Sequence, residues 1–112
     1  MNKFSISIAE AAEQLKKETE KKFTVLMQHG TMQVEYFAPE HIDTQTPHAQ
    51  DEIYVITSGR SSFYRAGETI ECSTGDILFV PAGMEHRFVN FSKDFATWVI
   101  FYGPDGGENN KA

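Results

Sequence analysis

The N-terminal part of the chain has the pattern of an amphipathic helix. Ser7 is followed three residues later by Glu10, which is the arrangement of a helix-capping box. Residues 16–22 are entirely polar, so we expect the helix to end near Lys16 and to lie on the body of the domain, covering a sheet edge or one end of a barrel. The apolar residues that recur at helical spacing, and would form its packing face, are Ile8, Ala11, Ala12 and Leu15.

From Phe23 onward, short apolar and alternating segments predict β-strands. Turn signals such as Ser58-Gly59, Ala66-Gly67 and Thr74-Gly75 stand between them. About eight strands with short connections favour a sandwich or barrel over alternating strands and helices. The predicted strands are residues 23–29, 31–38, 52–57, 61–65, 69–72, 76–80, 86–91 and 95–102.

Length and charge narrow the possible functions. The 112 residues include 10 Lys and Arg against 16 Asp and Glu, so the formal net charge is −6. This length predicts one barrel domain over residues 23–103, preceded by a helical segment (1–22) and followed by a flexible tail (104–112). An acidic chain without a basic stripe is not expected to bind nucleic acid. Its longest apolar runs are too short to cross a bilayer, so we expect no membrane partner.

The single cysteine, Cys72, cannot form an internal disulfide and is expected to be a small buried side chain. The N-terminus has no charged segment followed by a long apolar run, so no signal peptide is recognised. We therefore expect a cytoplasmic location.

Two of the four histidines have positions that suit a metal site. In a continuous extended chain, Thr46, His48 and Glu52 would share one face, because side chains alternate between faces. Glu52 would then lie among apolar residues, where a carboxylate needs a cation or several donors. His86 begins another predicted strand. Two imidazoles and a carboxylate that converge predict a divalent metal site, with a metal-free polar network as the alternative.

Two segments resemble the sequence motifs of the cupin family. Residues 48–52, His-Ala-Gln-Asp-Glu, followed after six residues by Gly59, resemble the second half of the first motif. The resemblance implies an all-β double-stranded β-helix, a jelly-roll cupin barrel with a short N-terminal helix, and a metal bound by His48, Glu52 and His86. The residues that match the second motif, which is separated from Gly59 by fifteen residues, are Gly75, Pro81, Gly83, His86 and Asn90.

One position departs from the family pattern. The first motif usually begins with His-x-His, and Thr46 takes the place of the first histidine, so four ligands become three. Three ligands leave open positions for water, substrate or dioxygen, although the change could equally mark a lost metal. Residues 43–52 also resemble a stretch found in a subgroup of small bacterial cupins. A bulge near Pro47 could turn Gln45 toward the metal, which makes Gln45 the reserve fourth ligand.

The resemblance implies one divalent transition metal, which we expect to be iron, manganese, nickel or zinc. We expect a small metalloenzyme, oxygenase- or isomerase-like, that acts on a small organic molecule; its catalytic residues are not identified. The alternatives are a non-catalytic barrel that binds or senses a small molecule, and a structural cupin. For acid–base chemistry the sequence offers only tyrosines and His41, which is expected to lie in a loop.

The sequence also gives expectations about a charged substrate and about self-association. Arg60, Arg65 and Arg87 could bind an anionic substrate, although solvated strand ends are the favoured interpretation of these three positions. We expect a homodimer, because an exposed edge strand favours covering by a partner.

Overall fold

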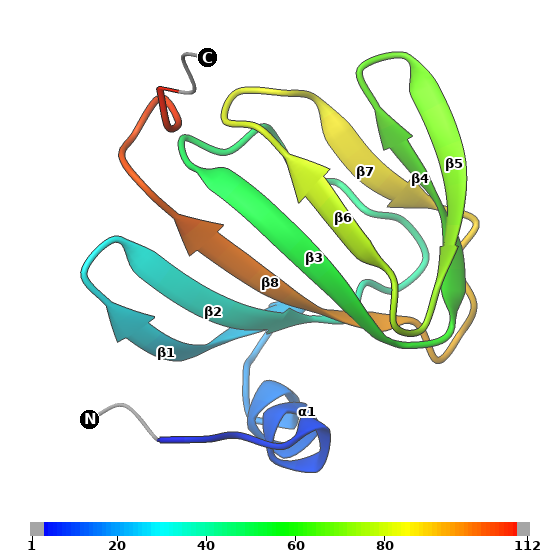
Figure 1. The fold of residues 1–112 in the computed structure, drawn as a ribbon. Helices are drawn as coiled ribbons and strands as arrows, with labels where there is room; N and C mark the ends of the chain where they lie inside the picture. Colours follow the sequence, from blue (N-terminus) through cyan, green and yellow to red (C-terminus); the bar gives the residue numbers. More distant parts are fainter. Residues whose placement is uncertain (1–3, 110–112) are drawn as a thin grey trace.

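Eight strands follow one short helix in the computed structural model, which describes residues 4–109 (Figure 1). The prediction of an all-β protein with a short N-terminal helix is confirmed. Within residues 4–109, no helix has the length and apolar character that a membrane crossing requires. The elements are α1 (Ile8–Lys16), β1 (Phe23–His29), β2 (Met32–Phe37), β3 (Asp51–Ser58), β4 (Arg60–Arg65), β5 (Glu68–Ser73), β6 (Ile77–Val80), β7 (His86–Val89) and β8 (Ala96–Tyr102).

The strands form two antiparallel sheets that are not joined into one closed hydrogen-bonded barrel within the described chain. The larger sheet has the order β1-β2-β8-β3-β6 and the smaller one β5-β4-β7. The last strand, β8, lies between β2 and β3, so segments far apart in sequence are paired, as in a jelly roll. This topology places the first residues of β3 and β7 in different sheets.

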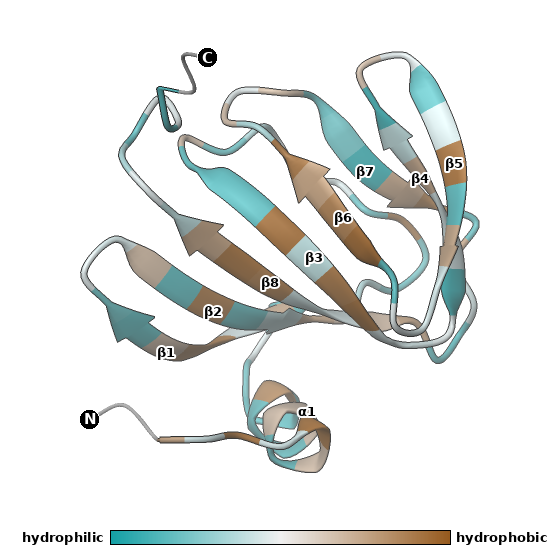
Figure 2. Cartoon of the chain, in the orientation of Figure 1, coloured by the Kyte–Doolittle hydropathy of each residue, from teal (hydrophilic) through white to brown (hydrophobic). Residues whose placement is uncertain are grey.

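The hydrophobic core lies between the sheets and is rich in aromatic rings. In β3 the even-numbered residues Tyr54 and Ile56 are buried, as strand alternation predicts, whereas the beginning of this strand is hydrophilic (Figure 2). Phe88 contacts three rings at centroid distances of 4.7–4.9 Å, each pair worth about 0.5–1.5 kcal/mol beyond its burial. Cys72 is a buried free thiol, as expected, and burial raises its pKa to about 11.

The helix α1 begins with the predicted capping box. The Glu10 N–H donates to Ser7 Oγ at 3.1 Å, and the Ser7 N–H donates to Glu10 Oε1 at 2.9 Å. Ala11 is fully buried where the helix packs on the larger sheet, and the helix ends at Lys16 before the polar run. Residues 1–3 of the expected helical segment lie outside the described residues. The sheet residues in this second cluster include Tyr36, Ala96 and Trp98.

The strand β1 has the predicted bounds, and no strand end differs from its predicted position by more than two residues. The clearest difference is β7, which ends at Val89 although the prediction extended it to Phe91. Asn90 adopts a φ of 55°, in the left-handed region that asparagine tolerates better than most residues, and this conformation ends the extended backbone.

The first part of the expected flexible tail is tied to the turn that precedes β3. The Gly106 N–H donates to the Ala49 carbonyl at 2.7 Å, and the Glu108 N–H donates to Asp51 Oδ2 at 2.8 Å. Asp51 Oδ1 also accepts from the Ala82 N–H at 2.9 Å. Asp51 therefore joins three segments at the point where β3 begins; residues 110–112 lie outside the described residues.

Candidate metal centre

Three side chains from two strands and one loop converge at a single point. Each of His48, Glu52 and His86 offers a ligand atom, and these atoms lie within 4.8 Å of one another. Glu52 Oε1 lies 2.9 Å from His86 Nε2 and 3.8 Å from His48 Nε2. The Glu52 and His86 side chains are buried, whereas that of His48 is 32% exposed. The centre is therefore reached from solvent on the His48 side.

The hydrogen-bond partners of His86 show which of its ring nitrogens carries a hydrogen and what therefore faces Glu52. His86 Nδ1 lies 2.9 Å from the Met84 carbonyl oxygen, which can only accept, so Nδ1 carries a hydrogen. In the neutral ring, Nε2 then presents a lone pair to Glu52 Oε1. Unless His86 carries a second proton, neither buried oxygen of Glu52 has a hydrogen-bond donor within the described chain. A buried carboxylate facing such acceptors requires a cation, and the two imidazole nitrogens and one carboxylate suit a divalent transition metal.

Gln45 adds a fourth potential ligand atom, an amide oxygen, to this group. Its Oε1 lies 3.2 Å from His48 Nε2 and 3.1 Å from His86 Nε2, and it accepts a hydrogen bond from the Tyr54 hydroxyl at 3.0 Å. The Gln45 Nε2 donates to Asp43 Oδ2 at 2.6 Å, and a carboxylate accepts only from the NH₂ end of an amide. The amide orientation is therefore fixed, with its oxygen toward the centre.

The expectation that Thr46 shares a face with His48 is wrong. Residues 38–50 form no strand, so side-chain alternation does not apply there. Thr46 is exposed, whereas Gln45, which a continuous strand would direct away, faces the histidines. The position of the family's usual first histidine is thus not part of the centre in this chain, and the nearest substitute is an amide oxygen.

Asp43 is a functional residue that the sequence analysis missed. It is 4% exposed, and its carboxylate accepts from the Gln45 N–H at 3.1 Å and from the Phe88 N–H at 2.9 Å, besides the Gln45 amide. It therefore fixes the loop that carries Gln45 to strand β7. The Asp43 side chain accepts from the N–H of the residue two positions later, which is the pattern of an Asx turn. This pattern is the sequence signal that could have identified Asp43.

The two histidines of the centre have opposite pKa shifts. Burial lowers the pKa of His48, with a further lowering by His86, although Glu52 and Asp43 oppose the shift. Burial also acts to lower the pKa of His86, but the hydrogen bonds with Glu52 and Met84 outweigh it, and the net shift is upward. His48 is thus neutral at neutral pH, whereas a metal ion that binds at His86 would have to compete with a proton.

A cavity of about 390 Å³ adjoins the centre. Gln45, His48, Glu52 and Tyr54 form one part of its lining. Burial raises the pKa of Tyr54 well above its usual value, and the nearby carboxylates add to this shift, so the hydroxyl keeps its proton. The cavity can therefore bring a small molecule directly to the group of potential ligands. Its apolar lining consists of Phe23, Phe37, Val99 and Phe101.

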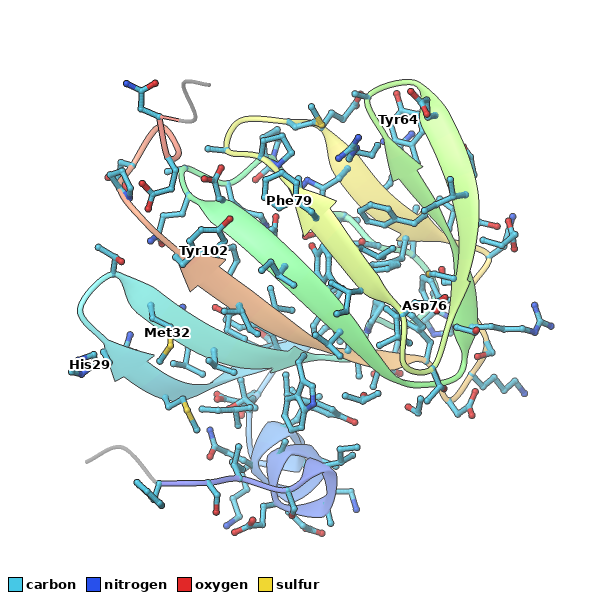
Figure 3. All side chains as sticks on the ribbon, in the orientation of Figure 1. His29, Met32, Tyr64, Asp76, Phe79 and Tyr102 are labelled. Atoms are coloured by element: carbon cyan, nitrogen blue, oxygen red, sulfur yellow. The ribbon has the colours of Figure 1, made fainter. Side chains whose placement is uncertain are left out.

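Several candidates from the sequence lie elsewhere. Figure 3 shows His29 at the end of β1, and His41 is an exposed loop residue with a φ of 62°. The Arg87 guanidinium stacks on the Tyr64 ring at 4.5 Å, and Arg65 Nη1 donates to the Phe79 carbonyl at 2.9 Å. Neither these two arginines nor Arg60 lines the cavity.

Comparisons with known proteins agree with this architecture. A family model described as a cupin domain matches residues 33–102. An uncharacterized protein of Streptomyces coelicolor is 41% identical over 63 residues, which are 56% of this chain and 60% of the relative. The alignment thus spans less than two thirds of that relative's length.

Solved structures show the same fold at low sequence identity. A cupin 2 conserved barrel domain protein from Salinispora arenicola has a TM-score of 0.62 at 20% identity, covering 72% of this chain and 74% of the other. KdgF from a Halomonas species has a TM-score of 0.63 at 20% identity, covering 70% and 74%. The DMSP lyase DddQ from Ruegeria pomeroyi has a TM-score of 0.62 at 22% identity, covering 72% and 46%. At these identities the likeness shows the fold alone.

Proposed function

Because the chain belongs to the family of cupin domain proteins, we propose that it is a small metalloenzyme, oxygenase- or isomerase-like, that acts on a small organic molecule. The metal is one divalent transition metal: iron, manganese, nickel or zinc. When bound, such an ion polarises a carbonyl group or activates water or dioxygen. Among the proteins with this fold, DddQ is by its name a lyase that acts on DMSP.

The proposal is supported by one observation: hydrogen-bond acceptors converge at one point, where only a bound metal ion or a second proton on His86 can hold them together. His48, Glu52 and His86 supply the ligand set, with both oxygens of Glu52 buried. Gln45 Oε1 lies within 3.2 Å of Nε2 of both histidines and supplies a neutral fourth ligand atom. This donor set fits a divalent ion while leaving coordination positions on the cavity side, where His48 is partly exposed.

The chain's own groups suit a small ligand at this place. The cavity of about 390 Å³ has the size typical of small-molecule sites. Tyr54 donates its hydroxyl proton to Gln45 and so holds the amide oxygen in place beside the histidines. Phe101, whose ring centroid lies 5.0 Å from that of His48, limits the orientation of the exposed imidazole.

The test is elemental analysis of the purified, untagged protein beside His86→Ala. We expect about one transition-metal ion per chain in the parent protein and its loss in the variant. His29→Ala is the matched control, because His29 is exposed and does not line the cavity beside the centre. Circular dichroism of each variant establishes that the barrel is folded. An unchanged metal content in His86→Ala, or no metal even after reconstitution, would refute the proposal.

We also propose that the protein is a homodimer and is cytoplasmic. Support for the dimer comes from β6, an edge strand of the larger sheet, which is hydrophobic along its length (Figure 2). Its residues Ile77 and Phe79 are 70% and 46% exposed. Phe79 continues an uncharged cross-strand row through Ile53 and Ile100. We expect light scattering after gel filtration to give twice the monomer mass, and a monomer for Ile77→Lys; a monomeric parent protein would disprove the dimer.

A further inference from the structure

The cavity beside the metal centre contains a second carboxylate. Alternation along β2 directs Gln33, Glu35 and Phe37 into the cavity, while Tyr36 packs under α1 on the other face. Glu35 is half-buried, and neither lysine nor arginine lines the cavity in the part of the chain that the structure describes. The cavity wall thus carries negative charge that no basic side chain balances.

Glu35 is held in place by neutral groups. Gln33 Nε2 donates to Glu35 Oε2 at 2.7 Å, and Gln33 Oε1 accepts from Gln28 Nε2 at 2.6 Å. Burial raises the pKa of Glu35, and the charge of Glu52 adds to this rise, although the hydrogen bond from Gln33 opposes it. A positive ion at the metal centre also opposes the rise and favours the carboxylate. The amides orient Glu35 without neutralising it.

We propose that Glu35 determines the charge of the cavity's ligand, so that the cavity takes uncharged or cationic small organic molecules and rejects anions. The inference rests on the proposed function, because it places the ligand beside the bound metal. Within the cavity lining, a divalent ion with Glu52 has one excess positive charge and would attract anions, since the Asp43 carboxylate lies behind Gln45 and does not line the cavity. Glu35 cancels that charge and lies in the same cavity, so an anion gains no net attraction there.

The apolar wall adds a second restriction. Phe23, Phe37 and Phe101 present aromatic surface to the cavity. Burying apolar surface against these rings stabilises a ligand with a hydrocarbon body, at about 25 cal/mol per Å² of apolar surface removed from water. The ligand class is therefore a partly apolar molecule whose polar group, directed to the metal, is a neutral oxygen or nitrogen.

The test compares two probes that bind the metal directly and differ in charge. The protein is loaded with Co²⁺, and its visible spectrum is followed during titration with azide, an anion, and with imidazole, which is mostly uncharged at about pH 8. Ionic strength is held constant. Glu35→Gln removes the charge and keeps the shape, Glu35→Asp keeps the charge, and Glu68→Gln is the control at an exposed carboxylate outside this cavity.

We expect Glu35→Gln to strengthen azide binding about tenfold and to leave imidazole binding within about twofold. Glu35→Asp and Glu68→Gln should bind azide as the parent protein does. Equal azide affinity in Glu35→Gln and the parent protein, both with bound Co²⁺, would overturn this inference and leave the metal site intact. Failure of the parent protein to bind Co²⁺ would overturn the proposed function itself, and this inference with it.

Discussion

His86 Nε2 lies 2.9 Å from Glu52 Oε1, and both side chains are excluded from solvent. The pair connects the two sheets, since Glu52 belongs to β3 and His86 to β7. Without metal, the contact is favourable only when the imidazole carries two protons. In the proposed metal-bound protein, the same atoms are ligands. A proton and the metal would then compete for His86 Nε2, and this competition can be measured.

Metal affinity should fall in two stages as the pH decreases. The first proton enters at His86, whose pKa is raised above 6.5, and the second at His48, whose pKa is lowered below 6.5. Because metal binding requires neutral imidazoles, the loss begins above pH 6.5 and steepens below it. Competition with a chromophoric chelator between about pH 5 and pH 9 measures the metal affinity at each pH. A metal affinity that does not change with pH would contradict the proposed competition between protons and metal at the two histidines.

In the metal-free protein the same shifts act on stability with opposite signs. The raised pKa of His86 contributes stability that is complete below 6.5 and is lost as the pH rises through the raised value. The lowered pKa of His48 contributes stability above 6.5 that is lost as the pH falls through the lowered value. The pH dependence of His86→Gln should therefore lose the first contribution and keep most of the second, because burial is the largest cause of the His48 shift. Denaturant unfolding at several pH values measures both contributions.

Glu52→Gln should separate metal binding from folding. At a metal concentration about a hundredfold above Kd, the parent protein gains about 2.7 kcal/mol in its free energy of unfolding. The variant lacks the anionic ligand and should gain much less. Without metal, at a pH above the pKa of His86, the variant should be at least as stable as the parent protein, because a buried amide needs no counter-charge. Equal stabilisation of both proteins by metal would exclude Glu52 as a ligand.

Gln45 and Thr46 provide a matched pair of adjacent residues. Gln45→Ala removes the oxygen that lies 3.1 Å from His86 Nε2 and should weaken metal binding by roughly ten- to a hundredfold. Thr46→Ala should leave affinity unchanged, because Thr46 is exposed. Thr46→His should also bring no gain, although the family motif has histidine there. A large gain in Thr46→His would show that the loop can rearrange to restore the usual site.

Most of the fold could be predicted from the sequence because strand length, alternation and turn residues are local signals. The eight strands and the capped helix follow from such patterns, and the buried even-numbered residues of β3 follow from alternation. The observed ends differ where one residue leaves the extended conformation, as Asn90 does. Which strands pair could not be derived locally, since β8 lies between β2 and β3.

The residues of the candidate centre could likewise be predicted only in part from the sequence. His48, Glu52 and His86 could be named because they match a motif and, for Glu52, strand parity. Gln45 could be named only as a reserve, and Thr46 was placed wrongly, because parity fails in a loop. The roles of Asp43 and Glu35 could not be predicted from the sequence. Asp43 accepts a hydrogen bond from Phe88, and Glu35 lines the cavity, and both arrangements form only in the folded chain.

Gly59 tests the fold away from the centre. Its φ is +74°, and a Cβ there would lie 2.8 Å from Phe95 Cα and 2.8 Å from Asp94 Oδ1. Gly59→Ala should therefore destabilise the protein by more than the roughly 1–3 kcal/mol typical of backbone strain alone. Gly67→Ala is the control, since Gly67 also has a positive φ, +90°, but open space around its Cβ position. Equal destabilisation of the two variants in urea unfolding would show that close approach to residues 94–95 is unimportant.

Asp43 should control the position of Gln45 without touching the metal. Asp43→Ala leaves the N–H of Phe88 and the Gln45 amide without their acceptor, which should lower the free energy of unfolding by about 1–3 kcal/mol. Asp43→Asn can keep an oxygen at the Oδ2 position, where it accepts from both the Phe88 N–H and the Gln45 amide, but its NH₂ group then replaces Oδ1 and faces the Gln45 N–H, which displaces Gln45 from the centre. Metal affinity should therefore fall in Asp43→Asn with a smaller loss of stability than in Asp43→Ala, and the double variant Asp43→Asn with Gln45→Ala should bind no more weakly than Gln45→Ala alone. Additive losses in the double variant would show that Asp43 acts on the centre by another route.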